Sequence, residues 1–208
     1  MARDDERRER AAQGPIVGGL PEVPGIGAAM RLTPGLGTHL RGLADEVLVK
    51  DYPGATIGRA DRELLATAVS AANDCFFCMD SHGAFAQVLL ETDGQDQRIE
   101  HIDTIKLGAS DGVEPKLAAL LHIARTVRRD PLRLERSDVA AAIDAGATDA
   151  DVQLAILIAS AFSMYNRLVD GFRTMTPPVT DVYHDERARQ IAEHGYSWQP
   201  TAAHAETR

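Results

Sequence analysis

Apolar residues recur at every third or fourth position through most of the chain between residues 38 and 172, which is the spacing of helices with one buried face. The stretch RADRELLATAVSAAN, residues 59–73, is typical, and its apolar side carries Leu64, Leu65, Ala68, Val69 and Ala72. No run of alternating apolar and polar residues indicates a strand. The pattern therefore predicts an all-α fold, a compact multi-helix domain.

The predicted helices begin and end at residues with ordinary capping roles. Asp61, Ser137 and Thr148 suit N-caps, because a short polar side chain can accept a hydrogen bond from a free backbone N–H. Gly108 and Gly146 suit C-terminal stops. The resulting helices cover residues 38–50, 59–73, 75–91, 95–107, 114–128, 137–146, 148–171 and 182–194.

Glycine and proline divide the chain into three predicted parts. Residues 1–37 are a charged, disordered start followed by an arm, GPIVGGLPEVPGIGAAMRLTPGLG, whose Gly and Pro content breaks both helix and strand. Residues 38–172 form the helical domain. Residues 173–208, which open with the break around TPPVTD, form a C-terminal arm.

Composition and charge narrow the classes of partner. The net charge of −9 leaves no basic excess to meet phosphates, so we expect no nucleic-acid partner. The start MARDDERRER has no apolar core, which argues against a secretory signal. The longest apolar run, Leu154–Phe162, is shorter than the roughly 20 residues of a membrane span. We therefore expect a cytoplasmic protein with no membrane partner.

The same run predicts an assembly. Leu154–Phe162 is apolar on all sides of its helix, so we expect it at the centre of the fold or in a subunit interface. A homo-oligomer follows from the second of these placements.

The candidate chemistry lies in NDCFFCMDSHGAF, which holds the only two cysteines of the chain. On one helix, Cys75, Cys78 and His82 fall within an arc of about 60°. Cys75 begins the helix, where the helix dipole lowers the pKa of a thiol, so this argument alone makes Cys75 the more acidic thiol. His82 lies one turn beyond Cys78 and can accept its proton, which would produce a nucleophilic thiolate.

Three interpretations of this cluster compete. The cysteines can be two buried small hydrophobes, which is how free cysteines usually behave. They can bind a metal with His82, although a structural zinc takes four ligands and no second ligand pair is present. They can form a dithiol–disulfide redox centre, which the C-x-x-C spacing in a cytoplasmic protein favours.

Glu63 is a candidate partner of the redox centre. It precedes Cys75 by twelve positions, and antiparallel packing of the two helices could bring its carboxylate back against the cysteines. A glutamate in the first turn of a helix also simply complements the helix dipole. The six remaining histidines are expected to be solvated: His39, His101, His122, His184, His194 and His204.

RADRELLATAVSAANDCFFCMDSHGAFA resembles the alkylhydroperoxidase D-like (AhpD-like), peroxidase-related branch of the carboxymuconolactone decarboxylase-like superfamily. The family pattern is Glu, eleven residues, C-x-x-C, three residues and His, and the chain fits it with Glu63, Cys75, Cys78 and His82. The resemblance extends over about residues 34–172. Phe77 departs from some relatives, which carry a histidine at this position.

The resemblance implies an all-α domain built on helical hairpins, assembled as a trimer or hexamer. It also implies an oxidoreductase that reduces a small hydroperoxide and is regenerated by an external dithiol of lipoyl or thioredoxin type, without a metal or cofactor. Cys78 would attack the peroxide, Cys75 would resolve the product as a disulfide, and His82 with Glu63 would relay protons. The lactone-decarboxylating branch lacks the cysteine pair, so its reaction is not carried over. The alternative is a helical scaffold or binding protein with structural or metal-binding cysteines.

Overall fold

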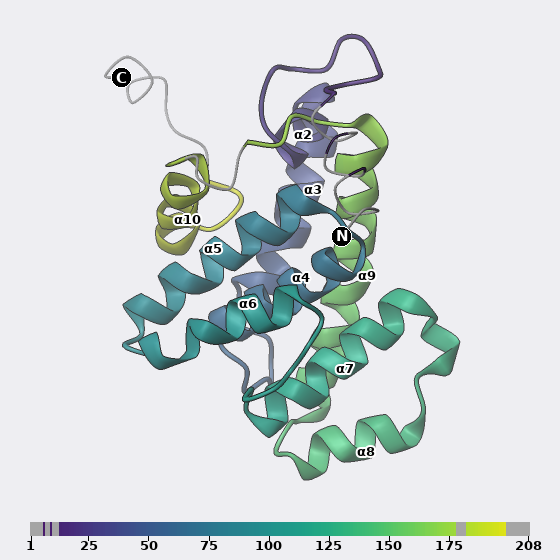
Figure 1. Ribbon diagram of the computed structural model, residues 1–208, viewed down its shortest axis with the longest axis vertical. Coiled ribbons are helices and arrows are strands. Elements are labelled where there is room, and N and C mark those ends of the chain that lie inside the picture. Colours follow the sequence, from purple (N-terminus) through teal and green to yellow (C-terminus); the bar gives the residue numbers. More distant parts are fainter. Residues whose placement is uncertain (1–5, 7–8, 10–12, 178–181, 199–208) are drawn as a thin grey trace.

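The computed structural model describes residues 6, 9, 13–177 and 182–198, and the described part of the chain contains helices but no strand (Figure 1). The predicted all-α class is therefore confirmed. Most of the predicted disordered start, residues 1–13, and His204 lie outside the described residues.

Each predicted helix has a counterpart in the structure. The α-helices are α2 (Ile26–Leu32), α3 (Pro34–Leu48), α4 (Arg59–Ala72), α5 (Phe76–Thr92), α6 (Glu100–Lys106), α7 (Pro115–Arg129), α8 (Arg136–Asp144), α9 (Asp149–Phe172) and α10 (Val182–His194). Two short 3₁₀ helices are η1 (Asp96–Arg98) and η2 (Pro131–Arg133). The single helix predicted over 95–107 is divided between η1 and α6.

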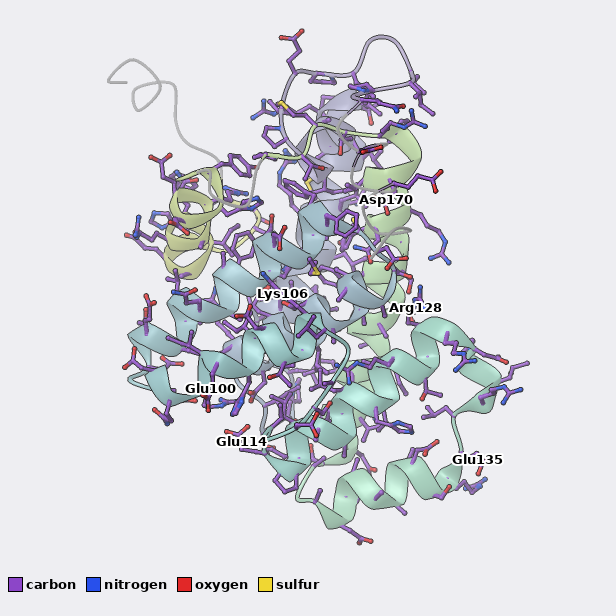
Figure 2. All side chains as sticks on the ribbon, in the orientation of Figure 1. Glu100, Lys106, Glu114, Arg128, Glu135 and Asp170 are labelled. Carbon is purple, nitrogen blue, oxygen red and sulfur yellow. The ribbon has the colours of Figure 1, made fainter. Side chains whose placement is uncertain are left out.

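The hairpin of α4 and α5 lies at the middle of the molecule (Figure 1). The chain reverses at Asp74, whose φ of 55° is left-handed. The Cys75 N–H closes the turn by donating to the Ser70 carbonyl at 3.0 Å. Helix α4 also packs against α7 and α9, and α5 packs against α10. Beside this hairpin lies Lys106 of α6, which Figure 2 labels. It donates to Oδ1 of Asp80 on α5 at 3.1 Å.

Helix α9 runs through the core, as its apolar sequence predicted. Leu154 and Ile158 are fully buried, whereas Leu157 and Met164 on its other side are 42 % and 39 % exposed. The helix is therefore buried on one face and not on all sides. Its 24 residues are long and apolar enough to cross a membrane by length and composition alone. A buried core helix meets the same criteria, and α9 packs against α2, α3, α4, α7 and α8.

A buried carboxylate fixes the start of α9. Thr148 is the N-cap, as predicted, and Asp151 completes a capping box with it. Asp151 also accepts hydrogen bonds from the backbone N–H groups of Thr56 and Ile57 at 2.6 and 3.0 Å. Burial opposes the charge of Asp151, but its bonds to Thr56, Thr148 and Ile57 together lower the pKa to about 2.

Two predicted N-caps are wrong. Gly58, with extended backbone, precedes α4, and Asp61 lies in its first turn, where Oδ1 accepts from Arg98 at 2.5 Å. Glu135 is the N-cap of α8, because its side chain and that of Asp138 form a reciprocal capping box. Ser137 is therefore inside the helix.

The glycine- and proline-rich arm contains a helix that its composition does not predict. Helix α2 follows Gly25, whose φ of 56° favours glycine. A Cβ on Gly25 would lie 1.9 Å from Cε1 of Phe77, so the missing side chain also lets the arm lie against the start of α5. The arm is thereby placed over the cysteine-bearing end of the central hairpin.

Candidate active site

The four predicted residues come together at the central hairpin. Glu63 on α4 is fully buried, and its Oε2 lies 2.6 Å from Nδ1 of His82 on α5. A carboxylate only accepts hydrogen bonds, so Nδ1 carries the proton and donates it, which leaves Nε2 of a neutral His82 as an acceptor. The pairing follows from the tight turn between the helices, which brings the second turn of α4 beside the second turn of α5.

The cysteines occupy different environments although they are one turn apart. Cys75 is the N-cap residue of α5, and Cys78 is three positions further along the helix. They lie 3.5 Å apart and are not bonded. Both are buried, but Cys78 lines a cavity beside the hairpin, whereas Cys75 lies behind it and is not among the cavity's lining residues.

The expected lowering of the Cys75 pKa by the helix dipole is not found. Its hydrogen bond with Cys78 and its burial raise the pKa of Cys75 well above the ordinary value. The helix dipole at the N-cap is not strong enough to offset these two effects. Cys75 is therefore held as a thiol next to Cys78.

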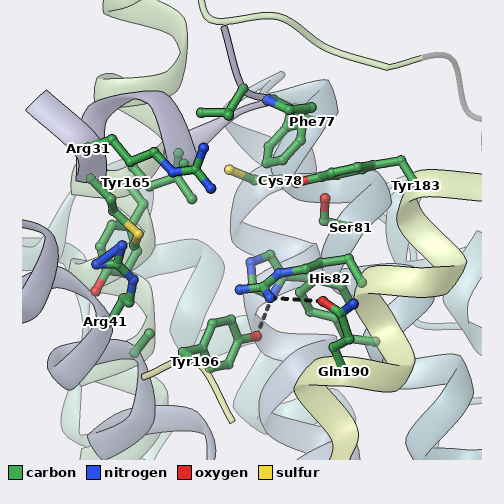
Figure 3. A pocket seen from close by; sticks show the side chains of 18 of the residues that line it. Arg31, Arg41, Phe77, Cys78, Ser81, His82, Tyr165, Tyr183, Gln190 and Tyr196 are labelled. Atoms are coloured by element: carbon green, nitrogen blue, oxygen red, sulfur yellow. Dashed lines mark hydrogen bonds between the residues drawn. The ribbon is translucent and has the colours of Figure 1, made fainter. Parts of the chain in front are cut away.

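A fifth residue, Tyr196, completes the buried cluster and was not predicted. Its hydroxyl donates to Oε1 of Glu63 at 2.8 Å. The same hydroxyl lies 3.3 Å from Nδ1 of His82, and Figure 3 shows these two residues side by side. Burial and the Glu63 charge raise the pKa of Tyr196 well above its usual value, so it remains a donor. The residue follows α10 in the predicted C-terminal arm, and no local motif marks it.

The segment that carries Tyr196 is fixed to α3. The backbone N–H of Tyr196 donates to Oδ1 of Asp45 at 2.6 Å, and the N–H of Ser197 donates to Oδ2 at 2.9 Å. The preceding Gly195 has a φ of 76°, and a Cβ there would come within 2.9 Å of Asp45 Oδ1. A buried carboxylate and a glycine therefore place the tyrosine over Glu63 and His82.

The cavity beside the hairpin has a volume of about 300 Å³. Cys78 and His82 open onto it from α5, as Figure 3 shows. Its apolar wall is formed mainly by Val23, Pro24, Ile26, Met30, Phe77, Phe85, Phe162, Tyr165, Tyr183 and Trp198. These residues come from the N-terminal arm, α5, α9 and the C-terminal segment. The cavity is therefore built largely from parts of the chain outside the central hairpin.

Two histidines expected to be solvated are buried instead. His184 on α10 is 3 % exposed, and its Nδ1 lies 3.1 Å from the hydroxyl of Ser81 on α5. Its ring lies 5.8 Å from that of Phe77. His101 on α6 is 9 % exposed. The helical pattern did not predict this burial, because it does not specify that α10 packs on α5.

This arrangement is suited to thiol chemistry. Among the described residues, no group of three or more His, Cys, Asp or Glu side chains is placed to hold a metal ion. His82 has a fixed tautomer with an acceptor nitrogen, and it lines the same cavity as Cys78. The cavity can admit a small molecule to this thiol, and a second thiol lies within contact distance.

The chain is similar to known proteins in part of its sequence and in its fold. Residues 39–126 match the Carboxymuconolactone decarboxylase family. No curated protein matches the chain by sequence. One similar solved structure is an uncharacterized peroxidase-related protein from Ralstonia eutropha JMP134, described as an alkylhydroperoxidase AhpD core. It is 21 % identical with a TM-score of 0.66, and the match covers 87 % of this chain and 90 % of that one.

A second similar structure is an uncharacterized peroxidase-related protein from Silicibacter sp. TM1040. It is 20 % identical with a TM-score of 0.62, and the match covers 74 % of this chain and 77 % of that one. At this level of identity the two structures establish the shared fold. Residues 39–126 therefore resemble the Carboxymuconolactone decarboxylase family, and the chain has the AhpD-like fold that its motif predicted.

Proposed function

We propose that the protein is a thiol-dependent peroxidase in which Cys78 and Cys75 form a dithiol–disulfide centre and His82 with Glu63 relays protons. The observation that carries the proposal is the position of Cys78 on a cavity that it shares with His82, whose Nδ1 is held by Glu63 at 2.6 Å. The family and the peroxidase-related structures agree with this class of reaction.

The first step oxidises Cys78. His82 accepts the thiol proton at Nε2, and the Cys78 sulfur then attacks the outer oxygen of a hydroperoxide, ROOH. The O–O bond breaks, an S–O bond forms, and the leaving alkoxide takes a proton from His82 to give ROH. Cys78 is left as a sulfenic acid, and the peroxide has been reduced by two electrons.

The second step uses the hidden thiol. Cys75 attacks the Cys78 sulfenic acid, which forms a disulfide and releases water. The present separation of 3.5 Å must shorten to about 2.05 Å for this bond. An external dithiol then reduces the disulfide and leaves as the oxidised partner, which restores both thiols.

The roles of the two cysteines follow from access. Cys78 lines the cavity and can meet a small peroxide, whereas Cys75 is fully buried and kept protonated by Cys78 and by burial. Cys78 can therefore attack the peroxide and Cys75 can resolve the product without the two cysteines exchanging places. Tyr196 holds the second oxygen of Glu63 and fixes the carboxylate for His82.

Location and assembly remain predictions. The expected cytoplasmic location fits the dithiol chemistry, because thiols stay reduced in that compartment. The expected homo-oligomer would cover the exposed side of α9, where Leu157 and Met164 face outward. Light scattering at micromolar concentration checks this, and a monomer mass of 22.5 kDa would contradict it.

The deciding experiment is turnover of tert-butyl hydroperoxide with dihydrolipoamide as reductant. We expect the wild type to consume the peroxide and Cys78→Ala to be inactive. In Cys75→Ser the sulfenic acid cannot be resolved, so dimedone should label Cys78 after peroxide treatment. The double variant Cys75→Ser/Cys78→Ser is the control and should remain unlabelled.

A wild type that shows no turnover and keeps both thiols free after peroxide treatment would contradict the proposal. That result would support the alternative, a helical scaffold or binding protein whose cysteines are structural. Near-stoichiometric zinc in the purified protein would instead identify the cysteines as metal ligands.

A further inference from the structure

The apolar cavity has three arginines in its wall. Arg31 comes from α2, Arg41 from α3 and Arg187 from α10 (Figure 3 labels the first two). They are far apart in the sequence, so their convergence is a product of the fold. No aspartate or glutamate is among the described residues that line the cavity.

The arginines have few partners for their charge. Arg187 donates to the neutral Oε1 of Gln190 at 3.3 Å. In the described ranges, no ion pair joins Arg31 or Arg41 to a carboxylate. This is unusual in a chain of net charge −9, where acids outnumber basic residues.

The three positive charges also repel one another. The pKa of Arg41 is lowered by burial and then by the charges of Arg187 and Arg31. The burial of Tyr183 raises its pKa, and Arg187 and Arg31 oppose that rise. Both effects require the guanidinium groups to act across the same cavity. Like charges that converge on one cavity repel one another, and an anion bound among them would offset that repulsion.

Arg41 lies against the preceding turn of its own helix. Gly37 is buried one turn before Arg41 on α3, and a Cβ there would lie 2.2 Å from the carbonyl oxygen of Met30 on α2 and 2.7 Å from Nη1 of Arg41. The arginine therefore lies back along its helix toward α2 and the cavity.

We propose that the cavity binds an anionic organic hydroperoxide, with a carboxylate held by Arg31, Arg41 and Arg187 and an apolar body that presents the peroxide to Cys78. This inference rests on the proposed peroxidase function and names its substrate class. Guanidinium groups recognise carboxylates through paired, charge-assisted hydrogen bonds, and the apolar wall suits an alkyl or aryl body. The arginines are substrate-binding residues in this scheme, and Cys78 is the reacting group.

The test compares two hydroperoxides that differ only in charge. They are 4-(2-hydroperoxypropan-2-yl)benzoate and its methyl ester, each mixed with reduced protein in the absence of any reductant. Oxidation is followed by thiol titration and by the fluorescence of Trp198, the only tryptophan, which lies in the cavity wall. Omitting the reductant ensures that a charge preference belongs to the peroxide step.

We expect the acid to oxidise the wild type at least about tenfold faster than the ester at subsaturating concentration. The ratio should fall toward one in Arg41→Gln/Arg187→Gln and stay at the wild-type value in Arg189→Gln, a change on α10 outside the cavity wall. It should also fall in the wild type as salt is raised, since salt screens the attraction. A wild-type ratio of one or less, or one insensitive to both salt and the double variant, would overturn the proposal.

A binding measurement separates this inference from the peroxidase function. Decanoate should bind the wild type far more tightly than decanol does, as measured by the quenching or shift of Trp198 fluorescence. The double variant should lose that preference. If neither hydroperoxide oxidises Cys78 but decanoate binds in this way, the peroxidase proposal fails and the anion site stands. If both hydroperoxides react equally and decanoate does not bind, the anion site fails and the peroxidase stands.

Discussion

The hydroxyl of Tyr196 donates a hydrogen bond of 2.8 Å to Oε1 of Glu63, although the two residues are 133 positions apart in the sequence. Both are buried, and Glu63 binds His82 through its other oxygen. The tyrosine therefore fixes the carboxylate that orients the histidine. It is a positioning residue, because it reaches Cys78 only through Glu63 and His82.

Tyr196→Phe should slow oxidation of Cys78 about tenfold, since Glu63 loses a partner and holds His82 less firmly. The lost buried hydrogen bond should also lower the free energy of unfolding by about 1–2 kcal/mol. Stopped-flow oxidation by tert-butyl hydroperoxide between pH 6 and 9, with urea unfolding, checks both. Tyr52→Phe is the control, because it removes an exposed bond to Gln153 away from the cavity. Equal pH profiles and rates in both variants would make Tyr196 a merely structural residue.

Glu63→Gln should have a larger effect on the same rate, a loss on the order of 10²-fold. The carboxylate fixes the proton on Nδ1 of His82, whereas an amide can also donate to Nδ1 and favour the other tautomer. Asp61→Asn on the same helix is the matched control, since Asp61 binds Arg98 and not His82. The assignment of Glu63 fails if both variants oxidise at the wild-type rate.

The two thiols should differ in reactivity without any peroxide. Iodoacetamide at neutral pH should label Cys78 in Cys75→Ser at least about tenfold faster than Cys75 in Cys78→Ser. The reason is that Cys75 is fully buried with a raised pKa, whereas Cys78 lines the cavity. Mass spectrometry of timed samples gives both rates. Faster labelling of Cys75 would reverse the proposed roles.

Asp151→Asn should destabilise the fold by about 2–4 kcal/mol at neutral pH, because a buried carboxylate with several donors loses its charge. The folded-state pKa of about 2 lies below the ordinary 3.8, so the ionised group stabilises the protein above about pH 4. That contribution is lost as the pH falls through about 2. Urea unfolding from pH 7 to pH 2 should show a smaller loss of stability in the variant than in the wild type. Parallel curves would contradict this role.

The parts of the fold that follow from local sequence could be predicted. The helix that starts at Thr148 was placed correctly because its capping box is contained within four residues. The approach of Glu63 to the helix that carries His82 could also be predicted, since one short turn joins the two helices. The cap predicted at Asp61 failed because Arg98, 37 positions later, binds that carboxylate.

The rest depends on contacts between distant segments. Tyr196 and His184 lie in a polar stretch whose pattern does not specify its packing on α5. Helix α2 is hidden among glycines and prolines, and its position depends on the fit of Gly25 against the ring of Phe77. The expected lowering of the Cys75 pKa failed because its hydrogen bond with Cys78 and its burial outweigh the dipole of one helix end.

The origin of the cavity wall has a consequence for how such a protein can diverge. The proposed reacting group and its relay, Cys78, His82 and Glu63, lie within the matched family domain of residues 39–126. Arg31 and Arg187, together with most of the apolar wall, lie outside that domain. Mutations in the two flanking segments that leave Tyr196 in place can therefore change which molecule is selected while the chemical step is preserved. Exchanging these flanks between relatives would exchange their substrate preferences, while the shared catalytic residues of the central domain stay the same.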